Sequence, residues 1–505
     1  MASLPLGRLG GIDRATFGRD VAASFVVFLV ALPLCLGIAI ASGVPAELGL
    51  ITGIVGGIVV GTLAGSPLQV SGPAAGLAVL VFDLVQRHGL AALGPVLLLA
   101  GAVQLVAGVA KLGQWFRAVS PAVVHGMLAG IGALIVVQQA HVLIDGQPLN
   151  GGLANMAAIP GAFLGVEDDR VLALTVGLVT IAFMIGWEKW KPQALRLVPG
   201  ALMGVLAGTL LASAGGFAIK RIDLPENIMG SIGLAGVSNI GMLADPALIG
   251  VALALAFIAS AETLLSAAAV DRMQDRARTQ FNKELGAQGI GNMICGLFGA
   301  MPMTGVIVRS SANVQAGAMT RASAILHGVW LLAFVALLPA LLAIVPTAAL
   351  AGVLVVTGVK LVKLKAVQEL FTRYGTLPAL VWVATFTLVV TVDLLTGVVV
   401  GLALAMLELV PHLRRLKLDV RRPSDDRIEL DGTATAVSVP RLAETLDTLP
   451  RGGTLAVDVS RLAYFDHTVS ELLTDALKRA KQGGTDVRVE GSSTRQHHQL
   501  AEALA

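Results

Sequence analysis

The stretch LFGAMPMTGVIVRS, residues 297–310, decides how this chain folds. It interrupts an apolar run with Gly299 and Pro302, and a charged residue, Arg309, follows soon after. Proline and glycine break helices, so one segment should end here and a short new helix should begin near Gly305. The stretch thus predicts that a helix begins between two hydrophobic segments, with an arginine close to its start.

A similar stretch, LAGSPLQVSGPAAG, occupies residues 63–76. In both stretches Leu-x-Gly is followed by a proline, then by a hydroxyl–glycine pair, and then by a short apolar segment. The two copies lie almost half of the chain apart. We interpret them as an internal repeat, a pattern that points to the binding site of a transporter. The alternative is that both are simple kinks in packed helices.

The composition predicts that most of the chain lies in a membrane. Of its 505 residues, 55% are hydrophobic and only 14% are charged, whereas soluble proteins have about 25% charged residues. The mean hydropathy is +0.80. A spanning helix needs about 20 apolar residues, and full or broken segments of this kind are expected at 21–41, 47–65, 73–86, 92–110, 118–142, 170–187, 196–215, 246–268, 286–301, 305–317, 320–345, 347–362, 376–391 and 393–411. We therefore predict an all-α polytopic membrane domain of fourteen segments in two groups of seven. Because seven is an odd number of spans, the second group is expected to be inverted in the membrane relative to the first.

The basic residues follow this arrangement. With the N-terminus inside, the outer loops hold only Arg87, Arg170, Lys220 and Arg221. The inner loops hold Lys111, Arg117, Lys189, Lys191, Arg196, Arg272, Arg276, Arg278, Lys283, Arg321, Lys360, Lys363, Lys365 and Arg373. An excess of Lys and Arg marks the cytoplasmic side, so both termini are expected in the cytoplasm.

The repeat predicts a site for an anion. Two half-helices that begin near Pro73 and Gly305 would direct unpaired N–H groups and positive dipole ends into one cavity at mid-membrane, an arrangement that attracts anions. Arg309 lies about one turn into the second half-helix and would add its charge. Its alternatives are to reach the cytoplasmic interface or to pair with an acid.

One acid, Glu262, lies deep in the eighth segment, within FIASAETLLSAA (257–268). It could carry a coupling proton, form a fixed pair with Arg309, or help to hold a cation. Ser266 lies one turn further on the same helical face and can add an oxygen.

The sequence contains none of the motifs that would predict an enzyme. It has no HExxH, GxSxG, Walker A or paired-cysteine site, so we expect neither catalytic residues, nor a metal, nor a cofactor. Its two cysteines, Cys35 and Cys295, lie inside apolar segments and are interpreted as packing residues. A net charge of +3 is too small to indicate nucleic acid.

After residue 411 the chain becomes soluble in character, so we predict domains 1–411 and 412–505. The tail is expected to be a small α/β unit with a partly parallel sheet. Strands are predicted at 433–439, 454–460 and 486–491, and helices at 440–448, 467–482 and 494–504.

These stretches together resemble the SulP (sulfate permease) family of anion transporters. The resemblance is most specific in ELGAQGIGN (284–292) and RSSANVQAGAMT (309–320), and FVVFLVALPLCLGIAIASGVP (25–45) resembles the family's first span. It implies a seven-plus-seven inverted repeat like that of nucleobase permeases, with a core domain (segments 1–4 and 8–11) that moves against a gate domain (5–7 and 12–14). It also implies a cytoplasmic STAS domain, a homodimer and, for a bacterial member, the inner membrane.

The resemblance also implies an anion site between segments 1, 3, 8 and 10. The substrate-binding positions carried over are Leu34, Ile38, Pro73, Ala74, Val306, Ile307, Val308 and Arg309, and Glu262 with Ser266 would serve in coupling.

Three positions depart from the family pattern. Leu34 replaces a glutamine that many members carry. Members thought to use sodium tend to have aspartate at position 262 and a hydroxyl at position 307, but this chain has Glu262 and Ile307, so we expect proton coupling or exchange rather than sodium. In the STAS tail, His467 stands where bacterial sigma-factor regulators have a phosphorylatable serine.

The substrate is expected to be a small oxyanion, bicarbonate or sulfate. A fumarate-like dicarboxylate carried with protons stays open, as does an anion channel. A nucleobase permease would share the fold but should offer an acid or amide in the tenth segment, where this chain has Arg309. A membrane-tethered STAS scaffold would not need Arg309 at all.

Overall fold

The computed structural model describes residues 14–164, 168–225, 235–274, 277–362, 368, 376–407, 418–424, 426–447, 449, 452–491 and 500. The chain divides into two compact units. One comprises Met1–Ala110 and Leu134–Val359, and the other comprises Lys111–Ala133 and Lys360–Ala505. The domain boundary expected at residue 411 stays a prediction.

The first unit is helical, apart from two very short strands. In chain order its elements are α1 (Arg14–Ala41), α2 (Ala46–Val55), the π-helical turn η2 (Gly56–Val60), α3 (Gly61–Leu63), β1 (Ser71–Pro73), α4 (Ala75–His88), α5 (Leu93–Val109), the second half of α6 (Pro121–Val142), α7 (Gly152–Leu164), α8 (Asp168–Trp190), α9 (Gly200–Ala214), α10 (Ala235–Ser238), α11 (Pro246–Met273), α12 (Phe281–Leu297), β2 (Met303–Gly305), α13 (Ile307–Gln315), α14 (Ala322–Leu337), α15 (Pro339–Ala343) and α16 (Thr347–Leu361).

A helix lies within each of the fourteen segments expected from hydropathy. Among the described residues six helices are long and apolar enough to cross a membrane, and six shorter apolar helices have 10–17 residues. The number of spans stays a prediction. Two described α-helices of the first unit lie outside the predicted segments: α7, which has 13 residues, and α10, which has four. Both are too short to span a membrane.

Many helices present large apolar side chains to the outside. Leu210 on α9 is 68% exposed, and Leu380 on α18 (Thr376–Thr391) is 60% exposed. Helices that are apolar all round are typical of a membrane domain, where lipid covers such side chains. The described helices are therefore those of a membrane-embedded protein.

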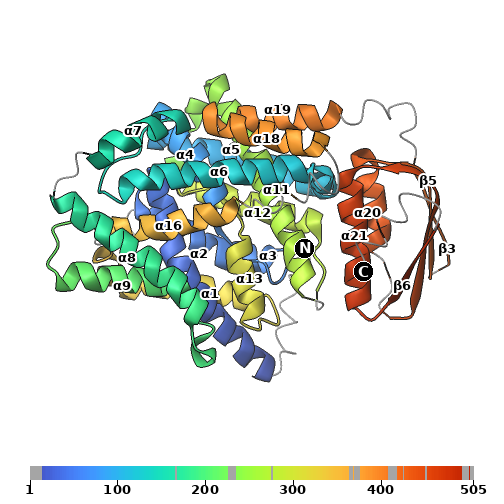
Figure 1. The fold of residues 1–505 in the computed structure, drawn as a ribbon, viewed down its shortest axis with the longest axis horizontal. Helices are drawn as coiled ribbons and strands as arrows, with labels where there is room; N and C mark the ends of the chain where they lie inside the picture. Colours follow the sequence, from blue (N-terminus) through green and yellow to red (C-terminus); the bar gives the residue numbers. More distant parts are fainter. Residues whose placement is uncertain are drawn as a thin grey trace. The chain divides into compact units, whose positions relative to one another are not determined.

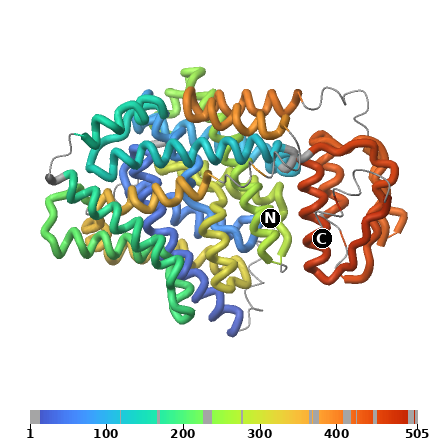
Figure 2. Tube along the Cα trace, viewed as in Figure 1, coloured from blue at the N-terminus to red at the C-terminus, as the bar shows by residue number. Residues whose placement is uncertain are grey.

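The two interrupted stretches meet in an antiparallel pair of strands. Ser71 of β1 lies opposite Gly305 of β2, and Pro73 lies opposite Met303. We call the paired strands β1 and β2, with the residues that flank them, the crossing. Figure 2 shows the blue segments from the start of the chain lying among the yellow and yellow-green segments of this unit. Because the strands are antiparallel, α4 and α13 leave the crossing from its opposite ends. Pro73 and Gly305 are two residues apart in register, or about 7 Å along the strands.

Polar side chains from neighbouring helices form hydrogen bonds with the backbone N–H and C=O groups around the crossing. Asn292 on α12 receives a hydrogen bond from Met303 N (2.8 Å) and donates to Met303 O (3.1 Å). Thr52 on α2 does the same for Met301, with both bonds at 2.9 Å. Gly305 N donates to Thr263 Oγ1 on α11 (3.0 Å). Non-helical backbone at membrane depth is stable only when it is paired in this way.

Glycine is required where the crossing is most crowded. A Cβ on Gly305 would lie 1.6 Å from Gln69 Nε2, whose amide is buried and donates to Thr263 O at 2.9 Å. A Cβ on Gly72 would lie 2.0 Å from Nη1 of Arg309. The glycine of each repeated hydroxyl–glycine pair therefore allows a close approach.

The second unit contains helices and a four-stranded sheet. Its helices are the short 3₁₀ helix η4 (Leu112–Ala118), the first half of α6, α18, α19 (Leu394–Leu407), α20 (Val439–Asp447) and α21 (His467–Gln482). Its strands are β3 (Leu418–Ser424), β4 (Arg427–Ala434), β5 (Thr454–Phe465) and β6 (Asp486–Glu490). The order is β3-β4-β5-β6, antiparallel for the first pair and parallel for the other two. Helices α20 and α21 cover one face of this sheet (Figure 1).

The predicted strand at 433–439 is wrong. Strand β4 ends at Ala434, a 3₁₀ turn occupies Ala436–Ser438, and α20 begins at Val439. The Ser438 hydroxyl accepts from Thr435 N (3.1 Å) and stabilises the turn, which ends the strand. The predictions at 454–460, 486–491, 440–448 and 467–482 each coincide with an observed element, and the sheet is partly parallel as expected. Of the helix predicted at 494–504 only Leu500 is described, so that helix stays a prediction.

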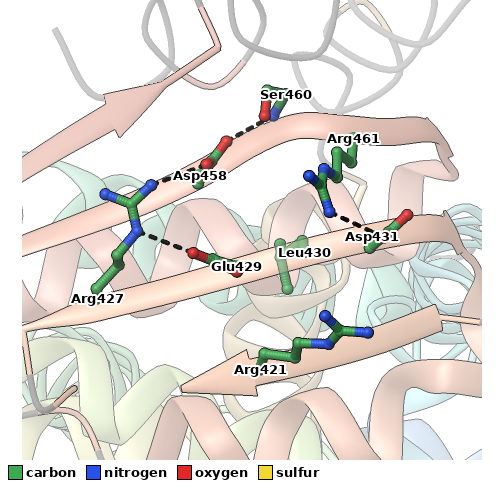
Figure 3. A pocket seen from close by; sticks show the side chains of 8 residues that line it. All are labelled: Arg421, Arg427, Glu429, Leu430, Asp431, Asp458, Ser460 and Arg461. Carbon is green, nitrogen blue, oxygen red and sulfur yellow. Dashed lines mark hydrogen bonds and ion pairs between the residues drawn. The ribbon is translucent and has the colours of Figure 1, made fainter. Parts of the chain in front are cut away.

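The sheet face opposite the helices carries charged side chains. On β4, Ile428 and Leu430 point into the core, while Arg427, Glu429 and Asp431 alternate onto the other face. Figure 3 shows Arg427 reaching Glu429 at 3.1 Å and Asp458 on β5 at 3.0 Å. This charge network spans neighbouring strands.

We expect Gly305→Ala to lower the melting temperature of the detergent-solubilised protein markedly, because the new methyl group displaces the buried Gln69 amide. Gly286→Ala is the matched control: its Cβ would meet nothing closer than Leu105 Cδ1 at 3.8 Å, and alanine favours the helix. Equal melting temperatures for the two variants would contradict the packing described here.

We expect Asp458 to stabilise the sheet above about pH 4 and to lose this effect in acid. Hydrogen bonds from the Ser460 hydroxyl and backbone N–H, and then the Arg427 charge, lower the pKa of Asp458 from its ordinary 3.8. A lowered folded-state pKa gives stability that is present above the unfolded pKa and lost as pH falls through the folded one. Hydrogen exchange of the β4 and β5 amides should differ between wild type and Asp458→Asn at pH 7 and converge as the pH falls below the lowered pKa of Asp458. A difference independent of pH would contradict this assignment.

Candidate functional site

One long helix precedes each of the two repeated stretches, α1 the first and α11 the second, and these two helices flank the crossing. Helix α1 packs against α4, α13 and β1, and α11 packs against α4, α13 and β2. The segments predicted to form the site, the first, third, eighth and tenth, are therefore neighbours. Sequence reasoning placed the half-helix starts near Pro73 and Gly305, and the observed helices begin two residues later, at Ala75 and Ile307.

Both half-helices begin without a capping side chain. Neither Ala74, the N-cap of α4, nor Val306, the N-cap of α13, provides a side-chain cap hydrogen bond. The N–H groups in the first turn of a helix have no partner within the helix. These groups, with the positive end of the helix dipole, favour a negative charge beside each start.

Arg309 lies on the first turn of α13 and is completely buried, with 0% of its surface exposed. Its Nη2 donates to Pro73 O at 3.3 Å, across the crossing. Nε and Nη1 have no hydrogen-bond partner among the described residues. This burial is incompatible with the alternative in which Arg309 reaches the membrane interface.

No carboxylate of the described part of the chain forms an ion pair with Arg309. Its guanidinium lies against neutral groups, the Pro73 carbonyl and the Gly72 backbone. A buried, unpaired charge is costly, so the site is incomplete without a negative partner.

Glu262 is on α11, beside the start of α4. A Cβ added to Gly76, in the first turn of α4, would lie 2.6 Å from Glu262 Oε2. This oxygen is shielded and has no hydrogen-bond partner among the described residues. Glu262 is therefore no ion-pair partner of Arg309, and the alternative of a fixed pair between them is wrong.

The remaining predicted residues fall into two groups. Leu34, Ile38, Ala74 and Ser266 are buried, with 6% or less of each exposed, and Pro73 is buried in β1. Val306 and Ile307 are partly buried at the start of α13, and Val308 is 44% exposed, so its side chain points away from the site. Val308 can contribute only its backbone.

Sequence reasoning missed the polar residues that build the crossing. Gln288 on α12 donates to Ser71 Oγ at 2.6 Å, and Ser310 Oγ on α13 accepts from Val70 N at 2.9 Å. Together with Asn292 and Thr263 they hold the strands that position Arg309. Asn292 and Gln288 lie one turn apart within the quoted ELGAQGIGN block, a polar stripe in an apolar segment that could have signalled this role.

The described residues contain no group of three or more His, Cys, Asp or Glu side chains that could hold a metal ion. In the C-terminal domain, Asp466 accepts from Val469 N at 2.9 Å and caps α21, and Thr468 is 4% exposed. The side chain of His467 lies outside the description, so its role stays a prediction.

Comparison with protein families gives two matches. The model of the sulfate permease family matches residues 17–385, and a STAS domain model matches residues 418–504. The chain belongs to the sulfate permease family. The family match covers the whole crossing, including both half-helix starts, Glu262 and Arg309.

Individual relatives and structures agree with this assignment. YvdB of Bacillus subtilis (strain 168), provisionally named a sulfate transporter, is 28% identical over 96% of this chain and 93% of its own length. The bicarbonate transporter BicA of Picosynechococcus is 27% identical over 82% of this chain and 74% of its own. The solved transmembrane domain of a cyanobacterial BicA matches with a TM-score of 0.65 at 24% identity, over 78% of this chain and 98% of that structure.

The anion transporter SLC26A9 gives a TM-score of 0.68 at 14% identity, over 99% of this chain and 88% of that structure. The fold is therefore a helical membrane transporter core with a C-terminal STAS-like α/β domain. The predicted membership of the SulP family and the STAS tail are confirmed.

We expect Arg309→Met to fold at least as stably as wild type in buffer of low anion content, because it removes a buried charge that has no ionic partner. Thermal unfolding in detergent measures this. Arg321→Met is the control: Arg321 Nη1 donates to Thr62 O at 2.7 Å, so its loss should lower stability slightly. A large loss of stability in Arg309→Met would show that the guanidinium is satisfied by the protein.

Proposed function

We propose that this protein is a secondary active transporter of small inorganic oxyanions, bicarbonate or sulfate. It binds the anion between α1, α4, α11 and α13 and releases it on the other side of the membrane by alternating access. This proposal goes beyond the family assignment in naming the site, the substrate class and the mechanism.

The observation that carries the proposal is Arg309. Two nitrogens of its guanidinium are shielded from solvent and have no hydrogen-bond partner within the described part of the chain. An anion that accepts from them would supply the missing charge. The uncapped starts of α4 and α13 add backbone donors, so an oxyanion with several acceptor oxygens fits these groups better than a neutral ligand.

The other site residues support a compact substrate. Leu34, Ile38 and Ala74 offer no side-chain hydrogen bond, so recognition depends on Arg309 and on the backbone of α4 and α13. Relatives named for sulfate and bicarbonate transport agree with this, and they do not favour a dicarboxylate.

We further propose the family mechanism, in which a core domain moves like an elevator against a gate domain. In this chain the core comprises α1, α2, α4, α5 and α11–α14, whose helices pack closely on one another. The gate comprises α6, α8, α9, α16, α18 and α19. The proposal includes fourteen spans in a seven-plus-seven inverted repeat, with domains at 1–411 and 412–505. We also propose that the protein is a homodimer in a bacterial inner membrane and that both of its termini are cytoplasmic.

Glu262 provides a route to proton coupling. Its carboxylate lies beside the first turn of α4, where a bound anion would also be attracted. An ionised Glu262 would repel that anion, whereas a protonated Glu262 would not. Proton and anion would then enter the site together, with Ser266 one turn away as an additional oxygen. We expect sodium to be the less effective coupling ion.

The function is tested by uptake of radiolabelled bicarbonate and sulfate into proteoliposomes with imposed proton or sodium gradients. We expect saturable uptake of at least one anion, stimulated by an inward proton gradient and lost in Arg309→Met. Current that does not saturate would indicate a channel, and uptake of a neutral base without either anion would refute the proposal.

We expect Glu262→Gln to abolish stimulation by the proton gradient while anion binding stays measurable, because the amide stays neutral at every pH. Counterflow exchange under equal pH measures binding and translocation without a gradient. Ser266→Ala is the control, and it should keep the dependence on protons. A Glu262→Gln transporter with unchanged proton stimulation would remove the coupling role.

A further inference from the structure

Helix α5 carries one polar side chain, Gln104, in an otherwise apolar segment. Gln104 is 1% exposed, and both ends of its amide form hydrogen bonds. Its Nε2 donates to Ser260 Oγ on α11 at 3.1 Å, and its Oε1 accepts from Asn292 Nδ2 on α12 at 2.7 Å. A polar group inside a membrane domain is costly unless it is paired in this way. Gln104 thus joins α11 to α12.

Asn292 continues this chain of hydrogen bonds to the crossing. It accepts from Met303 N at 2.8 Å and donates to Met303 O at 3.1 Å. Its amide hydrogens therefore serve Gln104 and Met303, and its amide oxygen serves Met303. Ser260 Oγ donates to Ala256 O at 2.6 Å, so towards Gln104 it is an acceptor. The direction of each bond is fixed, which leaves the amides of Gln104 and Asn292 one orientation each.

The two ends of this chain lie next to the groups of the proposed site. Ser260 precedes Glu262 by two residues on α11, which places their side chains on opposite sides of that helix. Ser260 faces α5, and Glu262 faces the start of α4. At the other end Met303 begins β2, and α13 with Arg309 begins two residues after β2 ends. The chain connects the helix that carries the carboxylate to the strand that leads to the arginine.

Close packing of the helices makes this chain possible. Helix α5 packs on both α11 and α12, and glycines let α5 and α12 approach closely. A Cβ on Gly101 would lie 2.6 Å from Gly289 O, and a Cβ on Gly289 would lie 2.5 Å from Leu105 N. Small residues at a helix interface let the two backbones come together in this way. An amide on α5 therefore reaches Asn292 directly, and an apolar side chain in its place could not bond to Asn292.

We propose that Gln104 is a positioning residue of the anion site: through Asn292 it fixes the start of β2, and with it the half-helix that presents Arg309. This inference rests on the proposed function for the anion, whereas the chain of hydrogen bonds is testable without transport. Without Gln104, one N–H group of Asn292 would have lost its partner, and the Asn292 amide could turn away from Met303. The anion would then bind more weakly, although the fold would persist.

The first experiment measures the chain by stability. Gln104→Leu and Asn292→Leu each remove one partner of the 2.7 Å bond, and a double-mutant cycle compares their melting temperatures in detergent. We expect Gln104→Leu to lower the melting temperature of the otherwise wild-type protein and to have little further effect after Asn292→Leu. If Asn292→Leu does not fold, Gln104→Leu with Ser260→Ala forms a second cycle, in which we expect the double variant to lose less than the sum of the single losses. Additive losses would overturn the proposal.

The second experiment measures the effect on the anion site. In proteoliposomes with radiolabelled bicarbonate or sulfate, and with rates taken per folded protein, Gln104→Leu should raise KM about fivefold with little change in kcat, as expected for one lost hydrogen bond. Gln104→Glu is the conservative variant: a protonated glutamate can accept from Asn292 and donate to Ser260, so its KM should stay close to that of wild type. Equal KM values for the two variants, or a loss in kcat alone, would show that Gln104 only packs.

Thr180→Val is the matched control. Thr180 on α8 is 0% exposed, and its Oγ1 donates to Val176 O within its own helix at 2.9 Å. The variant also loses a buried hydrogen bond, but it lies outside the chain that leads to Met303, so it should keep the wild-type KM. A rise in KM equal to that of Gln104→Leu would contradict a specific role for Gln104.

The two experiments separate this inference from the function on which it rests. Coupling between Gln104 and Asn292 without uptake of either anion would retain the chain of hydrogen bonds and refute the proposed function. Saturable uptake with a KM that Gln104→Leu leaves unchanged would retain the function and refute the role of Gln104.

Discussion

The structure depends on one constraint: backbone that leaves the helical conformation at membrane depth must find its hydrogen bonds inside the protein. The repeated Gly/Pro stretches break two helices, and the broken ends pair with each other as β1 and β2. Asn292, Thr52 and Thr263 satisfy the backbone at the crossing that the pairing leaves open. A crossing built in this way can present two helix starts without exposing their peptide groups to lipid.

The same crossing explains how a buried arginine is tolerated. Gly72 has no side chain, so the Arg309 guanidinium can lie against the β1 backbone and donate to Pro73 O. It is not neutralised there, because among the described residues its hydrogen-bond partner is a carbonyl and no carboxylate pairs with it. We propose that a bound anion offsets part of the cost of burying this charge, since ionisable residues inside membrane proteins usually mark functional sites.

The separation of Glu262 from Arg309 is equally informative. On the sequence alone these two residues could have formed a structural ion pair, since one acid and one base lay at similar depth. The structure places the Glu262 carboxylate against Gly76 in the first turn of α4, whereas the Arg309 guanidinium donates to Pro73 O, and among the described residues no ion pair joins the two. An anion and a proton can therefore act on neighbouring but distinct groups.

Hydropathy and charge by themselves determined the helical membrane domain, the soluble tail and the helix breaks near Pro73 and Gly305, because these follow from local composition and from the short-range chemistry of proline and glycine. They could not reveal the short helix α7 or the end of β4 at Ala434, where hydrogen bonds from Thr435 N to Ser438 and from Ala436 N to Asp466 stabilise a turn. Only the tertiary structure decided that the two breaks pair, that Asn292 and Gln288 support them, and that Arg309 lacks an acidic partner. The pairing of the breaks and the bonds of Gln288 to Ser71 and of Arg309 to Pro73 join residues more than 200 positions apart, and no local pattern encodes them.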